Sequence, residues 1–111
     1  MTPLEDLTIR KSALVFESAS EARIAVDDLT SSETAGLLQA VVETHAASVL
    51  ESGELHPVSV TLDMSVDAAA GAEVQFSSRI DRKTRTLIFA SGIATQNDRY
   101  LLKATVVFRI S

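Results

Sequence analysis

The chain contains no cysteine, only two histidines and only two prolines in 111 residues. Without a thiol it forms no disulfide, no thiolate metal site and no cysteine nucleophile. The two histidines, His45 and His56, are too few and too differently placed to predict a zinc site, so we expect no bound metal. The absence of cysteine therefore excludes a thiol nucleophile and a thiolate-bound metal centre.

Basic residues and long apolar runs are also scarce. Ten lysines and arginines stand against fifteen acidic residues, which gives a formal net charge of -5 at pH 7. Because binding to a phosphate backbone depends on clustered cations, nucleic acid is not an expected partner. No apolar stretch approaches the roughly 20 residues that span a bilayer, and the acidic segment Met1–Asp6 lacks the pattern of a secretory signal. We expect a cytoplasmic protein that binds neither membrane nor nucleic acid.

The overall composition is that of an ordinary globular chain. Hydrophobic residues make up 46% of the sequence and charged residues 23%. A length of 111 residues lies in the usual size range of one domain. We therefore predict a single domain over residues 1–111.

The second half of the chain alternates apolar and polar residues. Apolar side chains recur at every second position in Val58, Val60, Leu62, Met64 and Val66. This pattern predicts a strand with one buried face. Further strands are predicted over 72–81, 85–95 and 100–110, and the strand over 85–95 has apolar residues on both faces, which is typical of a strand covered on both sides. Four consecutive strands with short connections predict an antiparallel meander.

A long helix is predicted ahead of these strands, over residues 31–52. Thr30 and Glu33 have the spacing of a capping box at its start. One face of the helix carries Leu38, Val41, Val42, His45 and Val49. Two short strands, over 12–17 and 21–26, are predicted before the helix.

This arrangement resembles the hotdog fold, an α+β architecture in which an antiparallel sheet wraps around one long central helix. Over about residues 12–110 the sequence resembles in particular the thioesterases of the phenylacetate-degradation and 4-hydroxybenzoyl-CoA type. In that superfamily a His-Gly-Gly turn enters the helix, and an Asp or Glu follows seven residues after the second glycine. Here Gly36 precedes Glu43 by the same spacing. The strands after the helix and at the C-terminus are similar as well, at Val60–Val66 and Tyr100–Phe108.

The chain departs from the family pattern in two places. The three positions of the His-Gly-Gly turn read Thr34-Ala35-Gly36, so the imidazole and the first glycine are absent. In the family this turn offers backbone N–H groups to the thioester oxygen, and the resemblance implies that Ala35 and Gly36 bind substrate there. The connection over 67–71 is short and lacks a basic residue for the phosphates of coenzyme A.

The resemblance implies that Glu43 is the catalytic carboxylate. It would act either as a general base that activates water or as a nucleophile that forms a mixed anhydride. Gln39 lies one turn earlier on the same helix face and would orient water or the substrate carbonyl. Both residues also have structural interpretations, in which Glu43 faces solvent or an arginine of a second subunit and Gln39 is a hydrogen-bond partner.

Four further residues are weighed as parts of the site. Thr61 lies on the polar face of its strand and could contribute a hydroxyl, although a solvated or dimer-facing strand explains it equally well. Arg82 and Lys83 belong to the only concentrated positive charge and could hold the phosphates of coenzyme A or a carrier-protein arm; an exposed turn that guards the sheet from edge pairing is the alternative. For His45 we favour a structural role in the core or an interface.

We therefore favour a thioester hydrolase that acts on an acyl-CoA or acyl-carrier thioester, with a pocket at the interface of a homodimer or tetramer. Coenzyme A enters only as part of the substrate, and no other cofactor is expected. The alternative is a non-catalytic hotdog module for ligand binding or interaction that has lost thioesterase activity. A hydratase or dehydratase is a third possibility, which would need a histidine placed together with its acid.

Overall fold

The computed structural model describes residues 13–25, 29–64, 68–69 and 71–111. The described elements, in chain order, are β1 (Val15–Phe16), β2 (Glu21–Ile24), α2 (Ser31–Ser48), β3 (Leu55–Met64), β4 (Val74–Lys83), β5 (Leu87–Gln96) and β6 (Arg99–Ile110). Parts of three predicted strands lie outside the described residues, namely Ser12, Val26 and Ser65–Asp67.

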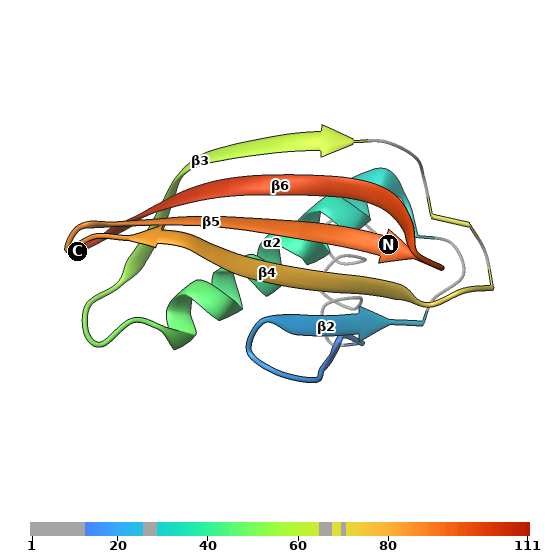
Figure 1. Cartoon of the computed structure of the whole chain (residues 1–111), viewed down its shortest axis with the longest axis horizontal. Helices are drawn as coiled ribbons and strands as arrows, with labels where there is room; N and C mark the ends of the chain where they lie inside the picture. Colours follow the sequence, from blue (N-terminus) through green and yellow to red (C-terminus); the bar gives the residue numbers. More distant parts are fainter. Residues whose placement is uncertain (1–12, 26–28, 65–67, 70) are drawn as a thin grey trace, which may run out of the picture.

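All six strands belong to one antiparallel sheet with the order β1-β2-β4-β5-β6-β3. The sheet curves over α2, which crosses one face of it (Figure 1). We call the face that contacts α2 the inner face and the opposite one the outer face. The predicted α+β architecture, an antiparallel sheet wrapped around one long helix, is confirmed.

The predicted meander is wrong in one connection. β4, β5 and β6 follow one another as expected, but β3 pairs with β6 rather than with β4. The free edge of β4 is occupied by β2 instead, in a register that runs from Glu21 opposite Ser77 to Ile24 opposite Val74. Alternation within a strand determines its two faces and leaves its neighbour undetermined. As a result β3 is an edge strand of the sheet.

The start of α2 follows the prediction. The Thr30 hydroxyl accepts a hydrogen bond from the Glu33 backbone N–H at 3.1 Å, and the Glu33 carboxylate accepts one from the Thr30 N–H at 3.0 Å. The helix ends at Ser48, four residues earlier than predicted, with Val49 as its C-cap. The Val49 N–H donates to the Ala46 carbonyl at 3.3 Å, a short closing bond that is common in the last turn of a helix.

The core lies between α2 and the inner faces of β4, β5 and β6. Gly92 of β5 lies beneath the helix, where a Cβ atom would stand 2.6 Å from Cγ2 of Val42 and 2.9 Å from Cδ1 of Leu38. Its missing side chain lets the helix approach the sheet closely. The largest fully buried side chains around this contact include Phe76, Phe108, Ile88, Leu102 and Val106.

The apolar face of β3 is not buried within one chain, contrary to the prediction. Val60, Leu62 and Met64 stand opposite Val106, Ala104 and Leu102 of β6 and so share their inner face. The β6 residues are at most 2% exposed, whereas Val60, Leu62 and Met64 are 41%, 40% and 53% exposed. α2 covers β6 but leaves this row of β3, which we call the β3 row, open to solvent.

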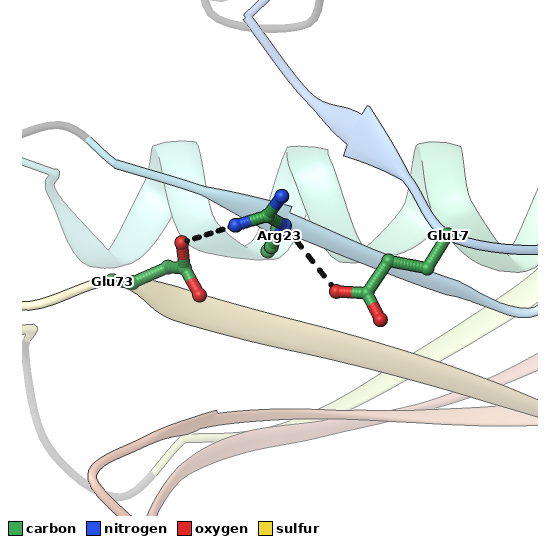
Figure 2. Close-up of polar contacts among 3 residues, drawn as sticks. All are labelled: Glu17, Arg23 and Glu73. Atoms are coloured by element: carbon green, nitrogen blue, oxygen red, sulfur yellow. Dashed lines mark hydrogen bonds and ion pairs between the residues drawn. The ribbon is translucent and has the colours of Figure 1, made fainter.

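One ion-pair cluster ties the first strands to the sheet. The Arg23 guanidinium on β2 donates a hydrogen bond through Nη1 to Glu73 Oε2 at 3.1 Å, and its Nε lies 3.3 Å from Glu17 Oε1 (Figure 2). The second contact is an ion pair without hydrogen-bond geometry, because the buried Nε makes no hydrogen bond. Half-exposed pairs of this kind contribute about 1 kcal/mol or less to stability.

Candidate active site

Glu43 and Gln39 lie on the flank of α2 that turns toward β6 and β3. His45 contacts Ser78 of β4, and Val42 stands over Gly92 of β5, which sets the sense of rotation around the helix. Each residue advances by about 100° around the helix axis. The direction that leads from His45, facing β4, to Val42, facing β5, leads next to Gln39 and Glu43, which therefore turn toward β6 and β3. Glu43 is exposed and Gln39 is half-buried.

By this rotation, the flank of the helix that carries Gln39 and Glu43 turns toward the side of the inner face on which the β3 row lies. The row is formed by Val60, Leu62 and Met64, each at least 40% exposed. An apolar surface beside a carboxylate and an amide is the composition expected of a small-molecule site, in which apolar walls hold the ligand and a few polar groups orient it. Within one chain the β3 row has no covering element in the described part of the molecule.

The three residues that replace the His-Gly-Gly turn lie inside the helix. The Thr34 N–H donates to the Thr30 carbonyl at 2.9 Å, and its hydroxyl donates to the same carbonyl at 2.9 Å. Thr34 is 2% and Ala35 9% exposed, while Gly36 is half-buried. The Thr34 side chain therefore serves the first turn of α2. The substrate-binding role of Ala35 and Gly36 stays a prediction.

The remaining predicted residues are not gathered around Glu43 within one chain. Thr61 stands opposite Thr105 on the outer face of β3, on the other side of the sheet from α2. Arg82 and Lys83 are exposed at the end of β4 beside the turn to β5. Only Gln39 is brought close to Glu43, by their spacing of one helical turn. The other residues could belong to the same site only if the substrate were long enough to reach them, or if a second chain brought them next to Glu43.

Comparison with solved structures shows the same architecture in proteins of low sequence identity. A phenylacetic acid degradation-related protein from Ralstonia eutropha JMP134 superposes with a TM-score of 0.79 at 18% identity, covering 99% of this chain and 92% of that one. Thioesterase superfamily member 2 from Mus musculus gives 0.73 at 17% identity, with 100% of both chains covered. Thioesterase superfamily member 2 of zebrafish gives 0.76 at 14% identity, covering 88% of this chain and 80% of that one. No protein-family model and no curated protein sequence matches the chain.

The chain has the hotdog fold that it shares with these solved structures. The alignments span 97% or more of this chain in several neighbours. Among the described residues no cluster of His, Asp and Glu could hold a metal ion, and no helix there is long and apolar enough to cross a membrane.

A polar contact that the sequence reasoning missed links the hotdog helix to its sheet. Nδ1 of His45 lies 2.9 Å from the Ser78 hydroxyl of β4, and both residues are half-buried. The signal was present in the sequence, since Ser78 interrupts the apolar face of Val74, Phe76 and Ile80, and His45 interrupts the apolar face of the helix. Two polar residues on facing apolar surfaces predict a mutual hydrogen bond. The contact fits the structural role that we favoured for His45.

A second polar group of the hotdog sheet lies on the outer face, away from Glu43. Burial acts to raise the pKa of the Asp81 carboxyl, but hydrogen bonds from Ser91 and Arg79 and the charges of Arg79 and Lys103 outweigh it and lower the pKa below its usual value. Arg79 Nε lies 2.6 Å from Asp81 Oδ1. Arg79 lies on β4 with Arg82 and Lys83, and this ion pair engages its guanidinium.

Proposed function

We propose that this protein hydrolyses acyl thioesters of coenzyme A at a site that includes Glu43 and that a second copy of the chain completes. The proposal is supported by the position of Glu43, an exposed carboxylate on the helix flank that turns toward the exposed β3 row, in a chain that shares its fold with thioesterases. Apolar side chains would hold the acyl group, and the carboxylate would act on its carbonyl carbon.

The reaction needs only the groups that this flank provides and one water molecule. As a general base, Glu43 takes a proton from water while the water oxygen bonds to the thioester carbon. The C–S bond then breaks, and the thiolate of coenzyme A receives the proton. As a nucleophile, a Glu43 oxygen bonds to the same carbon, coenzyme A leaves, and water cleaves the resulting anhydride. In both routes the Gln39 amide would orient the carbonyl or the water.

The open edge of β3 supports completion of the site by a second chain. An edge strand presents unpaired backbone N–H and C=O groups to a further strand, and ten residues of β3 lie on this edge. Two β3 edges paired antiparallel about a two-fold axis would extend both sheets into one. The two β3 rows would then lie side by side and bury part of their apolar surface against each other, which is favourable for side chains that are now 40–53% exposed.

The cations at the end of β4 are the groups of the chain best suited to the phosphates of coenzyme A. Arg82, Lys83 and Arg85 are exposed within four positions of one another. Arginine binds phosphate oxygens in pairs, and lysine adds a mobile point charge. Charge reversal of Arg82 or Lys83 would therefore raise the KM for acyl-CoA more than the KM for a short thioester that lacks the nucleotide.

The decisive experiment is a panel of short, medium and aromatic acyl-CoA substrates with the wild type and Glu43→Gln. The substitution keeps the shape of the side chain and removes the proton acceptor, so we expect kcat to fall by about 100-fold or more. Glu51→Gln, a change of the same kind at an exposed residue beyond the helix, is the matched control and should leave kcat unchanged. No turnover on any substrate, or equal turnover by Glu43→Gln, would refute the proposal.

The subunit contact is tested separately by light scattering. An assembly that contains this pair should have a mass of at least twice the 11.9 kDa of one chain. Leu62→Lys places a charge in the β3 row and should lower both the mass and the activity. Ser59→Lys places the same charge on the outer face of β3, opposite Val107, and should lower neither. A monomeric wild type at micromolar concentration would contradict the shared site.

A further inference from the structure

Unpaired positive charge gathers at one end of the sheet, where the turn between β4 and β5 lies beside the C-terminal end of β6 (Figure 1). Arg82 and Lys83 end β4, Arg85 follows in the turn, and Arg109 lies next to the last residue of β6. All four are exposed, and in the described part of the chain none takes part in an ion pair within 4.0 Å. We call these four residues the basic end.

Two carboxylates at neighbouring positions have partners of their own. Asp81 accepts a hydrogen bond from Arg79 Nε at 2.6 Å. Glu54 lies 3.9 Å from Nε2 of His56, the residue that stands opposite Arg109. In a chain with a net charge of -5, the basic end is therefore a local surplus of positive charge.

Two arginines of the basic end share the outer face with an aromatic ring. Arg82 stands opposite Phe89 of β5, and Arg109 stands opposite Leu87, two residues before Phe89. Phe89 and Leu87 alternate with the buried Ile88, so both point away from α2, and part of each side chain stays open to solvent. The ring and the leucine therefore lie between two guanidinium groups, one on each side.

The spacing of the sheet places both arginines within reach of one ligand. Neighbouring strands lie about 4.8 Å apart, and two residues along a strand span about 7 Å. Arg82 and Arg109 are two strands and one such step apart, so their Cα atoms are about 12 Å from each other. Their long side chains can turn inward from these positions toward a molecule that lies on Phe89.

The turn that carries Arg85 is held by hydrogen bonds of its own. The Thr84 N–H donates to the Leu87 carbonyl at 2.8 Å, and the Thr84 hydroxyl accepts from the N–H groups of Thr86 at 3.3 Å and Leu87 at 3.0 Å. The Ile110 N–H donates to the Thr86 carbonyl at 2.8 Å, which ties the end of β6 to the same turn. A frame fixed in this way loses less conformational entropy when it binds a ligand.

We propose that the basic end binds a phosphorylated nucleoside, with the base against Phe89 and Leu87 and the phosphates on Arg82, Arg85 and Arg109. Guanidinium groups bind phosphate oxygens through paired hydrogen bonds. Bases of every kind stack on aromatic side chains through their flat faces. Inorganic phosphate would use only the cations and an apolar ligand only the ring, whereas a nucleotide uses both parts of the surface.

The nucleotide has two possible sources, the adenosine end of coenzyme A or a free nucleotide. The first source rests on the proposed thioesterase function. The path of the chain supports it, because α2 ends at Ser48, five residues after Glu43, and Glu54 beyond the helix pairs with Ser111 at the basic end. The long arm of coenzyme A would pass around this end of the sheet, from the inner face to the outer one. The second source depends on no reaction.

Titration with adenosine 3′,5′-bisphosphate, which lacks the arm of coenzyme A, tests the site without any turnover. Arg109→Glu should raise the Kd measured by calorimetry by about 10-fold or more, because charge-assisted hydrogen bonds are lost. Arg99→Glu, the same charge change at the opposite end of β6, is the matched control and should change the Kd by less than about twofold, since distant charges are screened. No binding by the wild type, or an equal loss in both variants, would overturn the proposal.

Phe89→Leu tests the part of the site that contacts the base. The substitution keeps an apolar side chain and removes the aromatic ring, so the Kd for adenosine 3′,5′-bisphosphate should rise while the Kd for inorganic pyrophosphate stays the same. Equal weakening of both ligands, or of neither, would contradict a base on the ring. All variants should keep the circular dichroism spectrum of the wild type, because Phe89 is outside the buried core and both arginines are exposed.

Inhibition kinetics separate the two sources of the nucleotide. If the source is coenzyme A, adenosine 3′,5′-bisphosphate competes with acyl-CoA, and Arg109→Glu raises the KM for acyl-CoA more than the KM for a short thioester without the nucleotide. If the source is a free nucleotide, the bisphosphate binds with the same dependence on Arg109 and does not compete with acyl-CoA. A protein without thioesterase activity would still give the titration result, so the two proposals can fail separately.

Discussion

Nδ1 of His45 on α2 lies 2.9 Å from the Ser78 hydroxyl on β4, inside a helix–sheet contact that is otherwise apolar. The hydrogen bond joins the helix to the sheet near the point where β2 begins beside β4, since the Ser78 N–H donates to the Ser20 carbonyl at 2.8 Å. A half-buried polar pair is favourable only when both partners are present, because the group that remains after a deletion loses its partner. The pair therefore fixes one position of α2 along the sheet.

We predict that Ser78→Ala lowers the free energy of unfolding by about 1 kcal/mol and that His45→Ala lowers it by more, because it also removes apolar contact. The two effects should not add, since the second change removes a bond that the first has already broken. Chemical denaturation of both single variants and the double variant measures this coupling. Additive losses would contradict a direct interaction, and a loss of kcat in a stable Ser78→Ala protein would show a role in the reaction instead.

Gly92 should not accept a side chain. In Gly92→Ala the new Cβ would stand 2.6 Å from Cγ2 of Val42, so the helix or the strand must shift, and we expect a loss of about 1–3 kcal/mol in unfolding free energy. Val42→Ala removes the nearest of the obstructing atoms and leaves Cδ1 of Leu38 at 2.9 Å, so it should relieve part of the strain. The double variant Gly92→Ala with Val42→Ala should therefore be more stable than the sum of the two single losses implies, and strict additivity would show that the close approach is relieved elsewhere.

The capping box at the start of α2 should contribute measurably to stability. Thr30→Ala removes the hydroxyl that accepts from the Glu33 N–H, and we expect a loss of about 1 kcal/mol, seen as a lower denaturation midpoint. Thr30→Ser keeps the hydroxyl and serves as the control with little change. Equal stability of the alanine and serine variants would mean that water replaces the cap without cost.

The Asp81 carboxylate should make stability depend on pH in the acid range. Its pKa in the folded protein is lowered, against the effect of burial, by hydrogen bonds from Ser91 and Arg79 and by nearby positive charge. A group with a lowered folded pKa contributes stability at pH values above its unfolded pKa of about 3.9 and loses it as the pH falls through the folded pKa. Because about a third of the side chain is exposed, we expect less than about 1 kcal/mol.

The measurement for Asp81 is the difference in unfolding free energy between the wild type and Asp81→Asn across pH 2–7. The wild type should be the more stable protein above about pH 5, and the difference should shrink below about pH 4. Asp98→Asn, at an exposed position of the β5–β6 turn, is a control for general charge effects. A difference that stays constant over this range would contradict the assignment.

Local patterns in the sequence were sufficient for most elements. Thr30 and Glu33 located the start of the helix, because a capping box depends only on residues three positions apart. The β5–β6 turn also has a local cause, since Asn97 and Asp98 adopt positive φ angles of 51° and 62° there, a conformation that these residue types tolerate. The end of the helix at Ser48 was missed, because no single residue there stops a helix as proline does.

Pairing between distant strands could not be read from the same patterns. The alternation at Val60, Leu62 and Met64 correctly grouped these residues on one face. Whether that face is buried depends on what packs against it, and β3 lies at an edge beyond the reach of α2. The sequence placed Glu43 and Gln39 one turn apart on a helix; it could not show that Thr61 lies on the other side of the sheet.

The sequence by itself determined the period of each segment, the start of the helix, the turn chemistry and the absence of a thiol nucleophile, because all of these depend on residues that are neighbours in the chain. The tertiary structure alone decided that β3 pairs with β6, that the β3 row stays exposed, and that Arg82 and Arg109 flank Phe89 across three strands. These relations join residues far apart in the sequence, and their free energies come from packing and backbone hydrogen bonds that only the folded chain brings together.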